Sequence, residues 1–205
     1  MEITIIGTGS MARGIGTRAV GAGHVVRLVG RQDEKAAALA GELGASAAAS
    51  GDHVTGDVVI LAVPYSALGD VLSHYGDDFD GKVVVDITNP MDFTTFEPIK
   101  PEAGSAAEEI AAARPGAKVV KAFNTTFAGT LVDGRVAGQS LDVLLAGDDA
   151  GAKETIAHLV EESGLRPIDA GPLRRARELE AVGFLHISLQ QPLGTGFGSA
   201  LKILS

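Results

Sequence analysis

Cysteine and tryptophan are both absent from this chain of 205 residues, and aromatic residues make up only 4% of it. Without cysteine there is no disulfide, no thiolate metal ligand and no catalytic thiol. No apolar run approaches the roughly 20 residues that cross a bilayer. The first residues lead into a short apolar run and lack the basic region of a signal peptide. We therefore expect a cytoplasmic protein without a membrane partner, whose core is packed mainly with small aliphatic side chains.

Positive charge is also scarce, with 17 Lys and Arg against 26 Asp and Glu and a net charge of −9. This balance argues against nucleic acid as a partner, and any bound phosphate must be held by local amides and cations. No two of the five histidines have the spacing of metal ligands, so we predict no metal site. We expect four histidines to be solvated, and His186, in an apolar stretch, is better explained as a core or surface residue than as a catalytic one.

The N-terminal segment carries the clearest motif of the sequence. A short apolar strand over residues 3–6 leads into a glycine-rich turn and then into a helix, and a second strand follows over residues 25–29. This G-x-G-x-x-A pattern is a dinucleotide-binding fingerprint because it lies between a strand and a helix. The unpaired amides at the start of such a helix hold phosphate groups. The residues of the turn are Gly7, Thr8, Gly9, Ser10, Met11 and Ala12.

The end of the second strand predicts which nucleotide binds. NAD sites usually have an acidic residue there, whereas NADP sites have cations for the additional phosphate. Here the strand ends in Gly30 and Arg31, followed by Gln32 and by Lys35 four residues after Arg31. A cation in the first turn of a helix opposes its dipole, which favours a ligand role over a solvated helix start. We therefore predict NADP rather than NAD.

Strands and helices alternate along almost the whole chain, which predicts one α/β domain over residues 1–205 with a Rossmann-like doubly wound, mainly parallel sheet. Further strands are expected over residues 45–49, 57–64, 82–87, 118–122, 142–146 and 165–169, and helices over residues 34–43, 65–75, 106–113, 149–163 and 176–189. Residues 91–106 have no clear period and are expected to form a loop. Residues 174–205 are expected to form a C-terminal helix and tail that close the substrate pocket.

Ligands of such sheets bind beyond the carboxyl ends of the strands. The strand exits therefore form one group of candidates, at residues 7–12, 30–31, 63–65, 89–90, 123–125 and 171–172. Among them, Asn89 and Asn124 are suited to hydrogen bonds with the nicotinamide ribose or carboxamide. Prolines after a strand also have a plain structural reason, since they end strand pairing.

These motifs resemble the family of coenzyme F420-dependent NADP oxidoreductases, whose fold is shared by the NADPH domain of membrane metalloreductases. The resemblance spans nearly the full chain, at residues 6–12, 30–31, 62–65, 86–90, 121–125, 169–173 and 176–180. It implies NADP(H) bound in an extended pose, with a flat deazaflavin, coenzyme F420, stacked on the nicotinamide. By motif position, Thr8, Arg31, Gln32 and Lys35 would hold the 2′-phosphate. The remaining implied cofactor-binding residues are Ala62, Val63, Pro64, Tyr65, Asn89, Pro90, Ala122, Phe123 and Asn124.

Hydride transfer between two carriers needs a dry pocket and close approach, and it does not need a positioned general acid. The sequence accordingly has no Tyr-x-x-x-Lys pair and no evident His–acid couple, so no residue is assigned as catalytic. Two alternative functions and two smaller points remain open. The acceptor could be another small molecule (a flavin, ferric chelate, quinone or imine), or the chain could be a non-catalytic NADPH sensor. The cluster Arg174, Arg175 and Arg177 could meet an acidic ligand or only water, and the apolar C-terminal segment is compatible with a homodimer.

Overall fold

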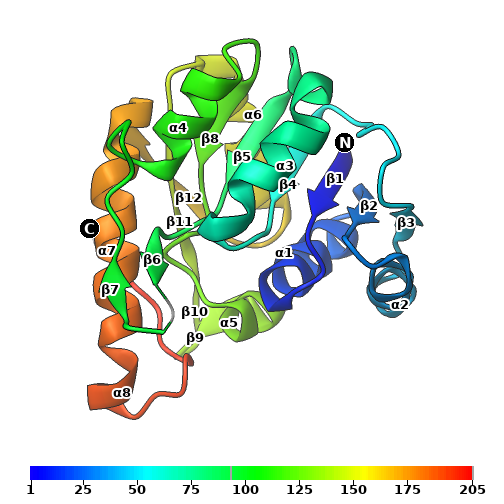
Figure 1. Ribbon diagram of the computed structural model, residues 1–205. Helices are drawn as coiled ribbons and strands as arrows, with labels where there is room; N and C mark the ends of the chain where they lie inside the picture. The colour runs from blue at the N-terminus through cyan, green and yellow to red at the C-terminus, as the bar shows by residue number, and fades with distance from the viewer. Residues whose placement is uncertain (93, 205) are drawn as a thin grey trace.

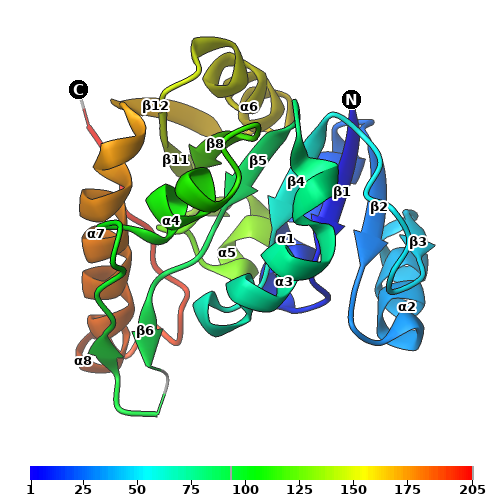
Figure 2. The same cartoon turned by 45° about the horizontal axis from the view of Figure 1, so that its top comes forward.

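The computed structural model describes residues 1–92 and 94–204, and in it eight strands form one sheet with helices on both faces (Figures 1 and 2). The strand order is β12-β11-β8-β5-β4-β1-β2-β3. The bounds are β1 Glu2–Ile6, β2 Val25–Val29, β3 Ser46–Ala48, β4 Val58–Leu61, β5 Val83–Asp86, β8 Lys118–Lys121, β11 Asp142–Gly147 and β12 Arg166–Gly171. The predicted Rossmann-like α/β fold is confirmed.

The sheet is buried on both faces because its strands are apolar at successive positions. In β4, Val58 and Ile60 belong to one core cluster, whereas Val59 and Leu61 belong to the other. Side chains alternate between the two faces of a strand, so a continuous apolar run supplies both cores. The helices α1 Ser10–Gly21, α2 Asp33–Leu43, α5 Ala128–Asp133 and α6 Ala150–Glu162 supply side chains to the first cluster, and α3 Leu68–Tyr75 and α4 Ala106–Ala113 to the second.

The sheet is not parallel throughout. Strand β11 runs antiparallel to β8 and parallel to β12, whereas the other neighbouring strands are parallel. The carboxyl end of β12 therefore lies on the side of the sheet where β1, β4, β5 and β8 begin, opposite their carboxyl ends. The expectation that residues 171–172 belong with the other strand exits is wrong for this reason.

Three short segments were not predicted. Residues 91–106, expected to be a loop, contain the antiparallel strands β6 Met91–Asp92 and β7 Glu97–Pro98. Helix α5 and the hairpin of β9 Arg135–Val136 and β10 Gln139–Ser140 lie in a part of the sequence for which no element was predicted. These strands are two residues long, too short to show a period.

The last long helix, α7 Ala176–Ser188, is followed directly by the single turn of α8 Gln190–Leu193 and by a tail. Pro192 lacks the backbone N–H that would continue the hydrogen-bond ladder of α7. The tail returns to the sheet, where Lys202 and the backbone N–H of Ile203 donate to the carboxylate of Asp142. Burial alone would raise the pKa of Asp142, but hydrogen bonds from Arg166 and Lys202 outweigh it and lower this pKa to about 2.

The lengths of the helices show whether any of them could span a membrane. Within the described residues, no helix is both long enough and apolar enough to cross a bilayer.

Candidate functional site

Two hollows meet at the N-terminus of α1, beyond the carboxyl ends of the central strands. A cavity of about 700 Å³ lies on one side and a cleft of about 430 Å³ on the other, and Gly9, Ala62, Val63 and Pro64 line both. We call them the large cavity and the small cleft. Because these four residues line both hollows, the two adjoin and form one continuous site. A dinucleotide that lies across the ends of the strands needs such a site.

The glycine-rich turn lies where the two hollows meet. Gly7 has a φ of 137°, and a Cβ atom there would lie 2.1 Å from the carbonyl oxygen of Ala62, so a side chain is excluded. Gly9 is the N-cap of α1, and a Cβ built on it would meet no atom within 4 Å. The first turn of α1 contains no acidic residue. This bare helix end therefore fits a pyrophosphate, which its unpaired amides would hold.

The small cleft brings together Thr8, Arg31, Gln32 and Lys35, the residues predicted for a 2′-phosphate. Gln32 is the N-cap of α2, so Arg31 lies outside that helix and Lys35 lies in its first turn. The argument from the helix dipole therefore applies to Lys35 and was wrong for Arg31. The carboxylate of Asp33 is already paired within the protein, since it accepts a hydrogen bond of 2.7 Å from the backbone N–H of Ser50.

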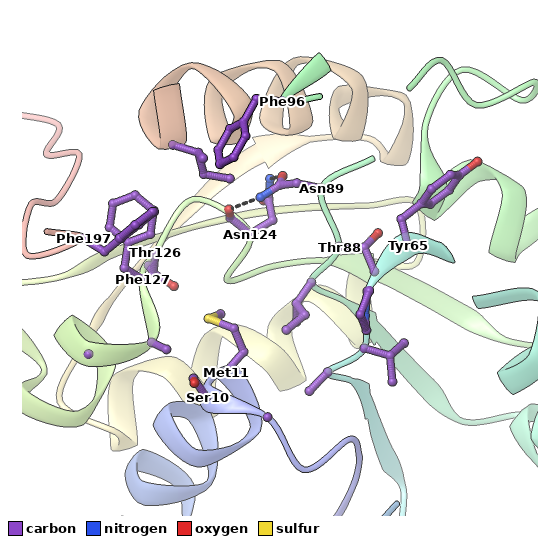
Figure 3. Close-up of a pocket in the computed structure, with 18 residues that line it drawn as sticks. Ser10, Met11, Tyr65, Thr88, Asn89, Phe96, Asn124, Thr126, Phe127 and Phe197 are labelled. Atoms are coloured by element: carbon purple, nitrogen blue, oxygen red, sulfur yellow. Dashed lines mark hydrogen bonds between the residues drawn. The ribbon is translucent and has the colours of Figure 1, made fainter. Parts of the chain in front are cut away.

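The inner end of the large cavity is formed by two asparagines (Figure 3). Asn89 donates to the backbone carbonyl of Asn124 at 2.8 Å, and Asn124 donates to Oδ1 of Asn89 at 2.9 Å. Asn124 also donates to the backbone carbonyl of Leu179 in α7 at 2.8 Å. The predicted asparagines therefore face the site as one fixed unit that joins the exits of β5 and β8 to α7.

A buried ion cluster lies beside this unit. Nζ of Lys121 donates to Asp86 and to Glu180, each at 2.7 Å, and to the carbonyl of Thr88 at 2.5 Å. The side chains of Lys121 and Asp86 are fully buried. Burial raises the pKa of Glu180, and the charge of Lys121 opposes this rise. The cluster ties the ends of β5 and β8 to α7, and sequence reasoning assigned it no role.

Aromatic side chains line the outer part of the large cavity. Phe96, Phe127 and Phe197 come from the β6–β7 hairpin, the segment before α5 and the tail (Figure 3). The ring of Phe127 stacks on that of His186 with centroids 4.2 Å apart, and Phe197 meets Phe127 edge-on at 5.1 Å. The tail is thus attached to the cavity wall through aromatic contacts.

His186 itself is buried and does not line the cavity. Its Nδ1 lies 3.2 Å from the carbonyl oxygen of Thr125, and its Nε2 lies 2.9 Å from the hydroxyl of Ser199 in the tail. Burial lowers the pKa of His186. It is a core histidine, in agreement with the preferred sequence interpretation. The expectation of a solvated side chain was wrong for His24, whose side chain is only 6% exposed.

Tyr65 is the one titratable side chain among the described residues that line the large cavity. Its hydroxyl donates to Glu109 at 2.9 Å. Burial and this hydrogen bond raise the pKa of Tyr65 to about 12. A phenol that is already donating and so weakly acidic is a poor general acid at neutral pH.

Not every predicted residue lines the two hollows. Ala12, Ala122 and Phe123 are buried in the core, and Pro90 is buried as well. Phe123 has a φ of 61°, which turns the chain after β8 and directs its ring inward. The arginines 174, 175 and 177 do not line either hollow, and Arg177 pairs with Glu108 at 2.7 Å.

Several lining residues were not assigned a cofactor-binding role from the sequence, although Thr88 and Ile187 lie in the segments 86–90 and 174–205 that had been linked to the site. Thr88, Phe96, Thr126 and Ile187 line the large cavity, and Ser50, Asp70, His74 and Tyr75 line the small cleft. Thr88 directly precedes Asn89 at a strand exit, so it could have been predicted from the sequence as a lining residue. The others come from helices and loops whose approach to the site depends on the tertiary fold.

The fold and this divided site define a Rossmann-type dinucleotide-binding protein. Comparison with known proteins identifies the family more closely. Residues 2–90 match the family model described as "NADP oxidoreductase coenzyme F420-dependent". The chain is 33% identical to the F420-dependent NADP reductase of Methanothermobacter thermautotrophicus, over 92% of this chain and 89% of that protein. It belongs to this family and is an NADP-dependent oxidoreductase.

Two further similarities are informative. A crystal structure of a putative F420-dependent NADP reductase from Arthrobacter sp. FB24 has a TM-score of 0.88 and 31% identity, over 99% of both chains. The metalloreductase STEAP3 of Rattus norvegicus is 33% identical over 88% of this chain. The chain spans about a third (36%) of the length of that metalloreductase.

Proposed function

We propose that this protein transfers a hydride between NADPH and coenzyme F420, a deazaflavin. NADPH and a proton would reduce the deazaflavin, with the hydride passing from C4 of the nicotinamide to C5 of the deazaflavin. The observation that carries the proposal is the continuous site, in which a small cleft with cations adjoins a large, mostly apolar cavity. Relatives named as F420-dependent NADP reductases support this choice of acceptor.

The NADP(H) half of the proposal rests on the small cleft and the turn. The amides at the start of α1 would hold the pyrophosphate. Arg31 and Lys35 would hold the 2′-phosphate, with Thr8 and Gln32 as hydrogen-bonding partners. Arg31 and Lys35 are both exposed, so their charges are available to a ligand at the mouth of the cleft.

The acceptor half rests on the composition of the large cavity. A flat ring system needs apolar walls on which it can stack, and Phe96, Phe127, Ile187 and Phe197 provide them. The chemistry needs two rings held close together in a dry site. Residues 174–205, which include Ile187 and Phe197, would exclude water from that site. We keep the homodimer as a prediction.

A second candidate acceptor is a ferric chelate. It is favoured by the identity to the metalloreductase STEAP3, although this chain corresponds to only part of that protein. A sensor that binds NADPH without turnover is the third alternative.

One assay distinguishes these functions. Purified protein is mixed with NADPH and oxidised F420, and the loss of deazaflavin absorbance is followed, with NADH, a ferric chelate and free flavin in parallel. We expect rapid bleaching with NADPH and slow bleaching with NADH. Reduction of the ferric chelate alone would favour the second candidate, and NADPH binding without any turnover would favour the sensor.

A further inference from the structure

Oδ1 of Asn124 is a buried acceptor that has no partner among the described residues. Its orientation follows from the neighbouring hydrogen bonds. Asn89 donates to the backbone carbonyl of Asn124, so Oδ1 of Asn89 must face the side chain of Asn124 and accept from its Nδ2. A flipped Asn124 amide would set its oxygen against two acceptors, Oδ1 of Asn89 and the carbonyl of Leu179. The unpaired atom is therefore an oxygen.

A second unpaired polar atom lies in the same cavity wall. Thr88 is 3% exposed and its Oγ1 is buried without a partner among the residues that the structure describes. Thr88 and Asn124 both line the large cavity, at the exits of the neighbouring strands β5 and β8. A buried donor or acceptor without a partner destabilises the protein that contains it, so the two atoms indicate a ligand that pairs with them.

Apart from the exposed Ser10 at the start of α1, the other polar side chains that line the large cavity are already used. The hydroxyl of Thr126 donates to the carbonyl of Phe123 at 2.7 Å, and that of Tyr65 donates to Glu109. The amide of Asn89 donates through Nδ2 and accepts through Oδ1 within the protein. The wall therefore offers a ligand one fixed acceptor and one hydroxyl that can donate.

We propose that Thr88 and Asn124 bind the carboxamide of the nicotinamide ring, with Oδ1 of Asn124 accepting from its N–H and Oγ1 of Thr88 donating to its carbonyl. A primary amide carries both a donor and an acceptor, which are the chemical complements of these two atoms. The dinucleotide lies along the strand exits, so its nicotinamide end meets Thr88 and Asn124 before the outer aromatic residues. This inference rests on the NADP(H)-binding part of the proposed function and is independent of the acceptor.

The geometry gives Asn89 and Gly183 supporting roles. Asn89 is a positioning residue, because its own hydrogen bonds are used to fix Asn124. Gly183 of α7 makes room for the pair, since a Cβ atom there would lie 2.5 Å from Oδ1 of Asn89 and 3.0 Å from Nδ2 of Asn124. The helix can therefore approach the asparagines closely enough for Leu179 to accept from Asn124.

The test compares two buried threonines, one that lines the large cavity and one that lines neither hollow. Thr88→Val removes an unpaired hydroxyl, so the melting temperature of the ligand-free protein should not fall. The affinity for NADP⁺, measured by calorimetry, should fall roughly 5- to 10-fold, the effect of one hydrogen bond. Thr130→Val is the matched control, because Thr130 is also buried but lines neither hollow, and its hydroxyl is paired with the carbonyl of Phe127 at 2.9 Å. It should lower the melting temperature and leave the affinity for NADP⁺ within about twofold. Thr88→Val with unchanged NADP⁺ affinity would overturn the role of Thr88.

The role of Asn124 is tested from the ligand side, with the NADP⁺ analogue in which acetyl replaces the carboxamide and removes its N–H. Wild-type protein should bind this analogue roughly 5- to 10-fold more weakly than NADP⁺, and Asn124→Ala should bind the two about equally. The fragment 2′,5′-ADP lacks the nicotinamide, so its unchanged affinity would show that the variant is folded. Equal binding of both dinucleotides by wild type would overturn the proposal. Absence of any NADP⁺ binding would instead contradict the proposed function itself.

Discussion

Arg31 is the residue on which the choice between NADPH and NADH should depend most. Its side chain is exposed at the small cleft, beside Lys35 and the N-cap Gln32. Arg31→Ala should weaken NADPH binding by about 10- to 100-fold, the effect of one charge-assisted contact, and leave NADH binding nearly unchanged. Fluorescence titration with each nucleotide measures this. Equal losses for both nucleotides would exclude contact with the 2′-phosphate.

Lys121 is the residue whose loss should most destabilise the fold near the site. Lys121→Met leaves Asp86 and Glu180 buried without their counter-ion, and we expect a loss of about 3–5 kcal/mol in the free energy of unfolding. Urea denaturation provides the measurement.

Lys118→Met is the matched control, because Lys118 lies at the other end of the same strand and its side chain is 48% exposed. Its effect should stay within about 0.5 kcal/mol. Similar losses in both variants would show that the buried cluster contributes nothing specific.

At the residue scale, the sequence predicted the turn and the residues that the small cleft brings together, because a local pattern carries both. The positions of Gly7, Thr8 and Arg31 follow from one strand–turn–helix unit. The ion cluster could not be predicted in the same way, since Asp86, Lys121 and Glu180 come from three elements far apart in the sequence. A lysine inside the apolar run of residues 118–123 was the available signal for a buried partner.

At the scale of elements, apolar runs predicted where the strands lie and could not predict their direction. A buried strand has the same composition whether it runs parallel or antiparallel to its neighbour. No feature of the sequence therefore indicated that β11 is reversed. Because of this reversal, residues 171–172 lie at the end of the sheet opposite the other strand exits. The contacts of α7 and of the tail with the cavity follow from this reversal.

The tail gives a pH-dependent prediction at this scale. The pKa of His186 is lowered by burial, so the stability that its neutral form contributes is present above about pH 6.5 and is lost as the pH falls through the lowered value. Because Ser199 of the tail hydrogen-bonds to His186, residues 194–204 should lose hydrogen-exchange protection in acid.

The measurement compares protection factors at about pH 7.5 and about pH 5 by mass spectrometry. His186→Gln, which cannot titrate, should show the same protection in the tail at both values. An equal loss of protection in wild type and variant would assign the effect to other groups.

At the scale of the whole molecule, the positive charge of the site comes from a few nearby residues, whereas the site itself extends over two adjoining hollows. In a protein with a net charge of −9, helix amides and nearby cations would have to hold the anionic cofactor, because the overall field opposes it. The large cavity and the small cleft meet at the N-terminus of α1 and share one wall. In the proposed function, this arrangement would bring the nicotinamide to the large cavity and leave the rest of that cavity to the second ring.

The central claim is direct hydride transfer between two rings in one cavity, and isotope transfer tests it most directly. NADPH carrying deuterium at C4, as each of its two stereoisomers in turn, is mixed with oxidised F420 and the protein, and the reduced deazaflavin is weighed by mass spectrometry. We predict that one stereoisomer delivers its deuterium to C5 in full and the other delivers none. Deuterium lost to water, or shared between both faces, would contradict the account.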